Sequence, residues 1–385
     1  MKKNVKVSVI IPSYNHSKFI ERTINSVLQQ TFDDFEIIVV DDCSTDNSTD
    51  VIDSIKDSRL KKFYLKENFG TVIALNFGLS KANGEYIATL GSDDMWEKDK
   101  LEKQINVLET NKNVGACFSW ANIVDENDQL LQTCGTINCE VFIQKNRTQG
   151  QWLRYLFENG NCLCHSSALL RKEVYDKIGN YNLAYRQLHD FEYWIKLINK
   201  YEIFIIKESL VKYRRIEKTN NSVSAVNLEN TTRVFNETYN IWFDYFFSYM
   251  NENVFIEAFK DKFKKKLNLS YEELICETFF VLKELNIGGV QCKALALRFL
   301  TENLNNDKII ECLKEHYNFN LSDFYKESGK EITFYPEFIK NKDLTDEISN
   351  LKIEYKNTIN EIYSSTSWKI TKPLRAISKI FRFKK

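Results

Sequence analysis

Short apolar runs alternate with amphipathic segments along the first hundred residues. The runs at 7–11, 36–40 and 86–90 are apolar at nearly every position and have the length of a strand, and a shorter run covers 63–65. Strands that are apolar on both faces are typical of a parallel sheet covered on both sides. The pattern therefore predicts an α/β fold with a Rossmann-like, mostly parallel sheet flanked by helices.

Two helical patterns lie between these runs. The segment 20–28 places its apolar residues on one helical face, and 73–79 shows a similar spacing before Asn83-Gly84. An Asn-Gly pair directly after a helical pattern is a typical helix C-cap. We therefore expect two helices, the second of them ending at this pair.

The predicted secondary structure changes twice along the rest of the chain. Strand-like patches at 115–120 and 203–206 lie in a mixed region, whereas about 228 to 320 is mainly helical. At 385 residues the chain is longer than a typical single domain. The pattern predicts three parts: an α/β domain at 1–220, a helical region at 221–340, and a short coiled-coil-like helix with a basic amphipathic tail at 341–385.

The last part combines two patterns. Apolar residues between 344 and 362 follow a short heptad-like spacing. In 368–385 basic residues alternate with an apolar stripe that contains Trp368 and Phe381, and no acidic residue occurs. Such a helix suits an anionic membrane surface, and a solvated basic tail is the alternative that stays open.

Composition narrows the class of protein. The chain has 53 Lys and Arg against 53 Asp and Glu, so its charge does not favour a nucleic-acid partner. No apolar stretch reaches the length of a transmembrane helix, and the N-terminal run is too short for a signal peptide. The nine cysteines show no repeated spacing, which favours reduced thiols. We expect a cytoplasmic protein, with a peripheral position on the inner face of the plasma membrane left open.

Polar residues gather where three predicted strands end. These clusters are Ser13-Tyr14-Asn15, Asp41-Asp42 and Ser92-Asp93-Asp94. Ligands of open α/β sheets bind outside the carboxyl ends of the strands, so we expect one pocket lined by all three clusters. Adjacent carboxylates such as Asp93 and Asp94 can serve a ribose hydroxyl and a Mg²⁺ or Mn²⁺ ion, and the alternative for this pair is a helix cap before Trp96.

Two stretches are long enough to compare with known families. They read VSVIIPSYNHSKFIERTINSVLQQTFDDFEIIVVDDCSTDNSTDVI at 7–52 and ENFGTVIALNFGLSKANGEYIATLGSDDMW at 67–96. Both closely resemble family 2 glycosyltransferases with the GT-A fold, of the bacterial polysaccharide-biosynthesis type. The resemblance covers about 5–215 and implies that the α/β domain at 1–220 is the catalytic domain. It implies a metal-dependent, inverting enzyme that moves a sugar from a nucleoside-diphosphate sugar, a UDP-sugar above all, to a hydroxyl of a glycan or lipid-linked acceptor.

The resemblance implies a role for each matching residue on the nucleotide-sugar side. Pro12, Ser13 and Tyr14 should border the nucleobase pocket. Asp42 should hydrogen-bond the base, with Asp41 beside it. On the neighbouring strand end, the same resemblance implies a ribose or metal contact for Asp93 and a ligand of Mn²⁺ or Mg²⁺ for Asp94.

The acceptor side is implied by two further matches. The stretch RQLHDFEYWIKL puts the general base at Asp190, and a helix N-cap before Phe191 is the alternative. The stretch NCLCHSSALLRKEVYDKIG makes His165 a polar wall of the acceptor site, with a structural histidine as the alternative. A zinc site at Cys162, Cys164 and His165 lacks a second ligand pair at the usual spacing.

Three positions depart from the pattern of the family. Gly91 stands where many relatives carry Asp, and Leu75 replaces a basic residue. The stretch 213–216 lacks the histidine of Tyr-Arg-x-His, so we expect Arg214 or Arg215 to bind phosphate instead.

Other classes of function fit less well. A nicotinamide-dependent dehydrogenase needs Gly-x-Gly-x-x-Gly after the first strand, where this chain has no glycine. A nucleotidyltransferase should open with a glycine-rich basic nucleotide loop, and the sequence has none there. A non-catalytic protein that binds sugar nucleotides or serves as a scaffold on the same fold remains the alternative. Homo-oligomerisation is left open.

Overall fold

The protein is described here by a computed structural model. The described residues are 5–131, 139–215, 228–265, 269–287, 290–329 and 357. The chain forms two compact units, 1–318 and 319–385. The residues of the heptad-like stripe and the basic tail at 368–385 lie outside the described residues, so the predictions made for 341–385 stay predictions.

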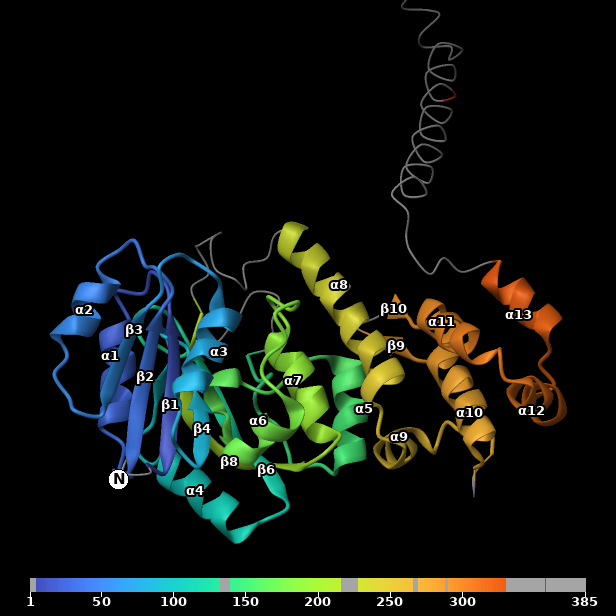
Figure 1. Ribbon diagram of the computed structural model, residues 1–385, viewed down its shortest axis with the longest axis horizontal. Helices are drawn as coiled ribbons and strands as arrows, with labels where there is room; N and C mark the ends of the chain where they lie inside the picture. The colour runs from blue at the N-terminus through green and yellow to red at the C-terminus, as the bar shows by residue number, and fades with distance from the viewer. Residues whose placement is uncertain are drawn as a thin grey trace, which may run out of the picture. The chain divides into compact units, whose positions relative to one another are not determined.

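The first unit contains a mixed eight-stranded sheet, and the later helices between 228 and 317 lie to one side of it (Figure 1). Its strands are β1 (Val7–Ser13), β2 (Phe35–Asp41), β3 (Leu60–Tyr64), β4 (Tyr86–Thr89), β5 (Met95–Trp96), β6 (Val114–Val124), β7 (Leu169–Arg171) and β8 (Glu202–Arg214). They are arranged in the order β3-β2-β1-β4-β7-β6-β8-β5. The first four strands of this order are parallel. Strand β7 is antiparallel to β4 and β6, β5 is antiparallel to β8, and β6 is parallel to β8.

The parallel half of the sheet confirms the predicted strands. Strand β2 is buried at every position and β1 at all but one, as expected for strands covered on both faces. The register pairs Val7 with Phe35 and Ser13 with Asp41. The carboxyl ends of β1 and β2 therefore lie side by side, and the polar residues that follow them share one edge of the sheet.

Helices accompany the strands and then follow them. Those of the sheet-forming part are α1 (Ile20–Leu28), α2 (Ser48–Ser54), α3 (Thr71–Lys81), α4 (Lys100–Thr110), α5 (Gln149–Asn159), the 3-10 helix η1 (His165–Ser167), α6 (Lys172–Ile178) and α7 (His189–Ile198). The later elements are α8 (Leu228–Asp244), its π-helical continuation η2 (Tyr245–Tyr249), α9 (Glu252–Phe259), α10 (Tyr271–Glu284), the hairpin β9 (Asn286–Ile287) and β10 (Val290–Gln291), α11 (Lys293–Asn303) and α12 (Asp307–Tyr317). The second unit contains α13 (Leu321–Ser328). The mainly helical character predicted after residue 228 is confirmed.

The turn after α3 differs from the prediction. The helix ends at Lys81, and Gly84 does not adopt the positive φ of a glycine cap. A Cβ atom on Gly84 would lie 2.4 Å from the backbone nitrogen of Ser8 and 2.7 Å from the carbonyl carbon of Val7. The position needs glycine because the chain passes directly against β1.

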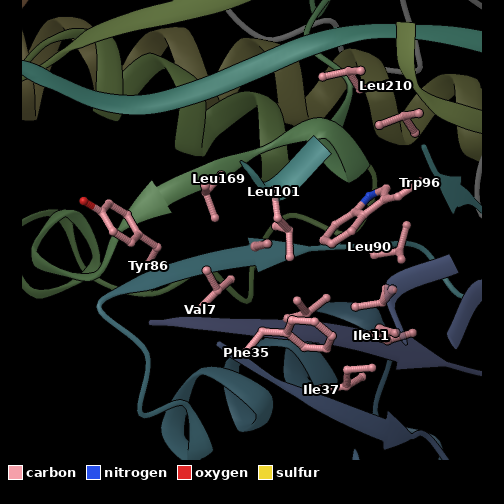
Figure 2. Packing of buried hydrophobic residues seen from close by; sticks show 14 of the residues in the cluster. Val7, Ile11, Phe35, Ile37, Tyr86, Leu90, Trp96, Leu101, Leu169 and Leu210 are labelled. Carbon is pink, nitrogen blue, oxygen red and sulfur yellow. The ribbon is translucent and has the colours of Figure 1, made fainter. Parts of the chain in front are cut away.

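The hydrophobic core continues to the strand ends that carry the polar clusters. Figure 2 shows Leu90, after β4, and Trp96, in β5, packed into the same core as Leu101 of α4. Trp96 is 5% exposed, and its indole N–H donates to the carbonyl of Ser166 at 2.8 Å. Buried anchors on both sides thus hold the Ser92-Asp93-Asp94 segment in place.

Two further expectations concern the whole chain. Cys139 is disulfide-bonded, so the prediction of reduced thiols is wrong for this residue; the other described cysteines are free. Spacing along a chain does not reveal which thiols meet in the fold. Within the described residues, no helix is both long and apolar enough to cross a membrane.

Candidate functional site

The two carboxylates at the end of β2 organise the surrounding loops. Asp41 accepts hydrogen bonds from the backbone N–H of Ser44 at 2.8 Å and from its hydroxyl at 2.6 Å. Asp42 accepts from the backbone N–H groups of Phe69 at 2.8 Å and Gly70 at 2.7 Å. Burial raises the pKa of Asp42, and these two hydrogen bonds partly oppose the rise. Asp41 therefore closes its own turn, while Asp42 fixes the segment that leads into α3.

The end of β1 carries two groups that a ligand could contact, the hydroxyl of Ser13 and the ring of Tyr14. The hydroxyl of Ser13 is buried and has no hydrogen-bond partner among the described residues. The carbonyl of Ser13 accepts from the backbone N–H of Asp42 at 2.8 Å, which joins the ends of β1 and β2. Pro12 lies opposite Val40 in the sheet, and Tyr14 is 42% exposed. An unpaired buried hydroxyl beside an exposed aromatic ring is suited to a polar, flat ligand.

Asp94 is deeply enclosed by the protein. It is 3% exposed, its Oδ1 accepts from the backbone N–H of Arg214 at 2.7 Å, and its Oδ2 accepts from the hydroxyl of Ser166. Burial raises the pKa of Asp94 well above its usual range, and the charge of Asp93 raises it further. Asp94 therefore joins the end of β4 to the end of β8 and to η1.

Asp93 has a different environment. It is half-buried, and no hydrogen bond to its carboxylate occurs within the described part of the chain. A Cβ atom on Gly91 would lie 2.9 Å from Oδ2 of Asp94 and 3.2 Å from Oδ1 of Asp93. The two carboxylates thus fill the space beside Gly91, where many relatives of the implied family carry an additional Asp. Of the pair, Asp93 has the carboxylate that is free to meet a ligand.

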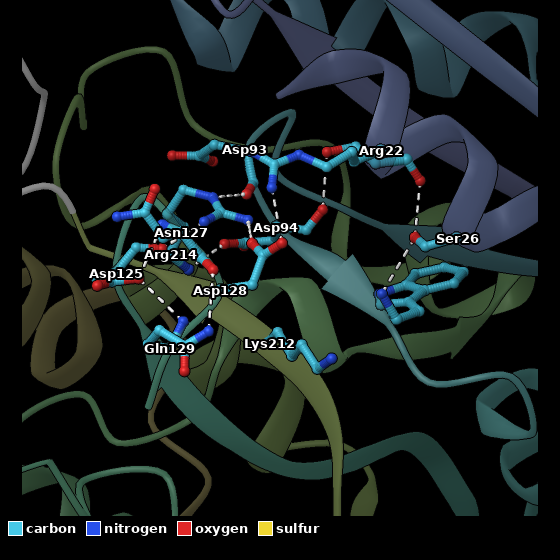
Figure 3. Close-up of polar contacts among 12 residues, drawn as sticks. Arg22, Ser26, Asp93, Asp94, Asp125, Asn127, Asp128, Gln129, Lys212 and Arg214 are labelled. Carbon is cyan, nitrogen blue, oxygen red and sulfur yellow. Dashed lines mark hydrogen bonds and ion pairs between the residues drawn. The ribbon is translucent and has the colours of Figure 1, made fainter. Parts of the chain in front are cut away.

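Arg214 braces this motif through hydrogen bonds to both of its residues (Figure 3). Its side chain is fully buried, and Nε donates to the carbonyl of Asp93 at 2.8 Å. The other guanidinium nitrogens donate to the carbonyl of Asp125 and to the carboxylate of Asp128, which also binds Arg22 at 2.7 Å. Arg214 is therefore not free to bind phosphate, because its guanidinium is enclosed and bound to these protein oxygens; of the two arginines expected to do so, Arg215 stays the prediction.

Tyr213 connects the two predicted parts of the site. Burial raises its pKa, and the charges of Asp94, Cys164, Asp93 and Asp190 raise it further. The phenol therefore lies within electrostatic reach of both the Asp93-Asp94 motif and the predicted base. The sequence draws attention to Tyr213 only as part of a partial family motif; that the charges of both predicted parts of the site act on its phenol was not anticipated.

Asp190 lies in the first turn of α7. One carboxylate oxygen accepts from the side-chain amide of Asn161 at 2.8 Å, and the other accepts from the backbone N–H of Phe191 at 2.7 Å. Burial raises the pKa of Asp190, against the opposing effect of His189. The N-cap position of α7 belongs to Leu188, so the alternative interpretation of Asp190 as the N-cap is wrong.

The family follows from relatives of this chain. The family model described as Glycosyl transferase family 2 matches residues 8–179. The putative teichuronic acid biosynthesis glycosyltransferase TuaG of Bacillus subtilis (strain 168) is 34% identical over 223 residues, which cover 57% of this chain and 81% of TuaG. The chain belongs to glycosyltransferase family 2.

One further relative and one structural neighbour of this family 2 glycosyltransferase are informative. The Escherichia coli enzyme WfaP, a UDP-Glc:alpha-D-GlcNAc-diphosphoundecaprenol beta-1,3-glucosyltransferase, is 35% identical over 196 residues, covering 50% of this chain and 70% of WfaP. The crystal structure of S. aureus TarS 1–349 in complex with UDP superposes with a TM-score of 0.51 at 17% identity, covering 84% of this chain and 88% of that one. At this identity the likeness concerns the fold, and it confirms the predicted GT-A architecture.

In this family 2 glycosyltransferase, His165 lies in an aromatic cluster next to α7. Its Nε2 is 3.0 Å from the hydroxyl of Tyr181, and the rings of Tyr181, His189 and Trp194 lie within 5.5 to 5.9 Å of its own. Burial lowers the pKa of His165 to about 3, so the imidazole is neutral at pH 7. A neutral, hydrogen-bonded histidine is compatible with both the acceptor wall and the structural interpretation.

The described residues hold no cluster of three His, Cys, Asp or Glu side chains suited to a metal ion. Cys162 and Cys164 are free and buried, and the zinc hypothesis therefore gains no support. A divalent ion at this site would need oxygens from a ligand in addition to a protein carboxylate.

Proposed function

We propose that this glycosyltransferase transfers a sugar from a UDP-sugar to a hydroxyl of a glycan or lipid-linked acceptor, with inversion, during assembly of a cell-surface polysaccharide. The observation that carries the proposal is the pair of carboxylates after β4: Asp94 is held by Arg214 and Ser166, while the Asp93 carboxylate has no hydrogen bond within the described residues. Two similar proteins support it: the relative WfaP uses UDP-Glc and a diphosphoundecaprenol-linked acceptor, and the structural neighbour TarS was crystallised with UDP. A contact of 368–385 with an anionic membrane is part of the same proposal.

The nucleotide is assigned to the edge formed by the ends of β1 and β2. The unpaired hydroxyl of Ser13 and the exposed ring of Tyr14 supply a hydrogen bond and a flat apolar surface. Asp42 already binds two backbone N–H groups, yet each carboxylate oxygen retains a lone pair for a base N–H. Asp41 contributes through the turn that it closes rather than through contact.

The metal is assigned to Asp93. Mg²⁺ and Mn²⁺ are bound through one or two carboxylates together with phosphate oxygens and water, which fits a single free carboxylate next to a bound diphosphate. Asp94 then holds the motif in shape and does not contact the ion. This division differs from the predicted one, in which Asp94 is a ligand of the ion and Asp93 contacts the ribose or the ion. When bound, such an ion stabilises the negative charge that develops on the leaving diphosphate.

The acceptor proton is assigned to Asp190. A carboxylate with a raised pKa and one side-chain hydrogen bond can take a proton from an attacking hydroxyl. Attack from the side of the base, opposite the leaving diphosphate, inverts the anomeric carbon.

The test is binding and turnover of UDP-, dTDP- and GDP-sugars with Mn²⁺, Mg²⁺ or EDTA. We expect Asp190→Asn to bind UDP and lose turnover, and Asp93→Asn to lose the metal-dependent part of binding. Asp99→Asn is a matched control, because Asp99 pairs with Lys103 on the surface. If the wild type binds no nucleotide sugar with either ion, the proposal fails, and a scaffold on this fold is the better account.

A further inference from the structure

The helical part of the first unit contacts the segment that leads to the predicted base. Glu237 of α8 is 5% exposed and points at the loop before α7. Its carboxylate accepts from three consecutive backbone N–H groups, those of Arg186 at 2.9 Å, Gln187 at 3.0 Å and Leu188 at 2.8 Å. One side chain therefore fixes the backbone of the residues that end two positions before Asp190.

A second carboxylate of α8 contacts the same loop. Asp244 accepts a hydrogen bond from the hydroxyl of Tyr185 at 2.8 Å. Asp244 follows Glu237 by seven residues, which is close to two helical turns, so both side chains project from one face of α8. The loop is thus held at both of its ends by a single helix.

Apolar packing fixes α8 itself. Trp242 is fully buried, and its ring centroid lies 4.5 Å from that of Phe157 in α5 and 6.0 Å from that of Phe191 in α7. Phe191 directly follows Asp190 in the chain. The helix that presents Glu237 is therefore packed against the same helix that carries the predicted base.

The N-terminus of α7 lacks a side-chain cap of its own. Its N-cap residue is Leu188, which has no side-chain oxygen and makes no side-chain cap. The first N–H groups of a helix need acceptors, and a negative charge near them is favourable. Glu237 supplies from α8 an acceptor for the backbone N–H of Leu188. It also adds a carboxylate at the start of α7 to the acidic residues Asp190 and Glu192 of the first turn.

We propose that Glu237 is a positioning residue for Asp190, and that α8 thereby sets the acceptor loop at 185–188. This rests on the proposed function, in which Asp190 is the base. The helical region then has a defined role, because the catalytic carboxylate is oriented by a part of the chain outside the predicted catalytic domain at 1–220.

The test compares Glu237→Ala, Glu237→Gln and Glu257→Ala in the full chain. Glu257 of α9 is the matched control, since its carboxylate accepts from the backbone N–H of Gly150 at 3.0 Å, also between the helical region and the sheet-forming part but at α5. The measurements are the Kd of UDP, kcat with the donor and acceptor that the wild type uses, and hydrogen exchange of the amides at 185–190.

We expect Glu237→Ala to exchange these amides faster and to lose about 100-fold in kcat, because a small displacement of a catalytic group has an effect of this size. The Kd of UDP should stay within about twofold, since binding of the nucleotide does not use the base. Glu237→Gln keeps one acceptor oxygen and should fall between wild type and Glu237→Ala. Glu257→Ala should retain the wild-type kcat.

Two results would overturn the assignment. If the wild type transfers sugar and Glu237→Ala keeps its kcat, Glu237 does not position Asp190. If Glu237→Ala loses UDP binding in proportion to kcat, its role is general stability. A wild type that transfers no sugar instead refutes the proposed function, while faster exchange at 185–190 in Glu237→Ala would still report the contact of α8 with the loop.

Discussion

Replacing Asp94 tests whether its carboxylate has a structural role or binds the metal ion. In Asp94→Ala, the backbone N–H of Arg214 and the hydroxyl of Ser166 both lose their acceptor in a buried place. Leaving a buried polar group unpaired costs about 1–3 kcal/mol, so the two together destabilise the fold by about 2–6 kcal/mol. That is a large share of the about 5–15 kcal/mol by which a typical protein is stable.

Asp94→Asn should behave differently, because it keeps the shape. Its amide oxygen can accept from Arg214, and its NH₂ group can donate to the hydroxyl oxygen of Ser166. Burial and the charge of Asp93 already raise the pKa of Asp94, so a neutral group at this place is well tolerated. We expect Asp94→Asn to lose less than about 1.5 kcal/mol of unfolding free energy, about one hydrogen bond.

The assay combines urea unfolding with titration of Mn²⁺ into protein and UDP. Asp94→Asn should retain Mn²⁺-dependent binding of UDP, whereas Asp93→Asn should lose it while unfolding at the urea concentration of the wild type. If Asp94→Asn folds normally and loses Mn²⁺-dependent binding as completely as Asp93→Asn, Asp94 contacts the ion directly and the assignment to Asp93 alone is refuted.

Two more predictions concern the base and the arginine brace. Burial raises the pKa of Asp190, and catalysis needs its ionised form. We therefore expect kcat to fall as the pH drops through a pKa above the value of about 3.9 that is usual for Asp. A pH–rate profile whose acidic limb has a pKa of about 3.9 or below would contradict this. Arg22→Ala should cost less than about 1 kcal/mol in thermal unfolding, because Arg22 is 41% exposed. Arg214→Met should cost about 3 kcal/mol or more, because it leaves buried partners unpaired; equal losses in the two variants would refute the brace.

The parallel half of the fold was predictable because its strands are apolar on both faces and end in polar clusters. Strands β5 and β7 have only two and three residues, too short for any periodicity to reveal. The antiparallel pairing of β7 with β4 is equally invisible in a local pattern, since it joins residues 81 to 85 positions apart, such as Tyr86 and Arg171.

For the candidate site, too, the sequence predicted some features and not others. Strand ends located Asp42, Asp93 and Asp94 at one edge of the sheet, because parallel strands bring their carboxyl ends together. The roles of these side chains depend on distant partners, since Asp94 meets Ser166 and Arg214, which follow it by 72 and 120 residues. Only the fold brings such groups together. The sequence of a carboxylate motif therefore does not show which carboxylate binds a ligand and which one has a structural role.

The stereochemistry of the product tests the central claim most directly. The wild-type protein would be incubated with an α-linked UDP-sugar, Mn²⁺ and a lipid diphosphate that carries a GlcNAc acceptor, and the new linkage would be assigned by proton NMR. The account predicts a β-linked product that Asp190→Asn does not form. An α-linked product would contradict inversion with Asp190 as the base, and so would a β-linked product formed equally well by Asp190→Asn.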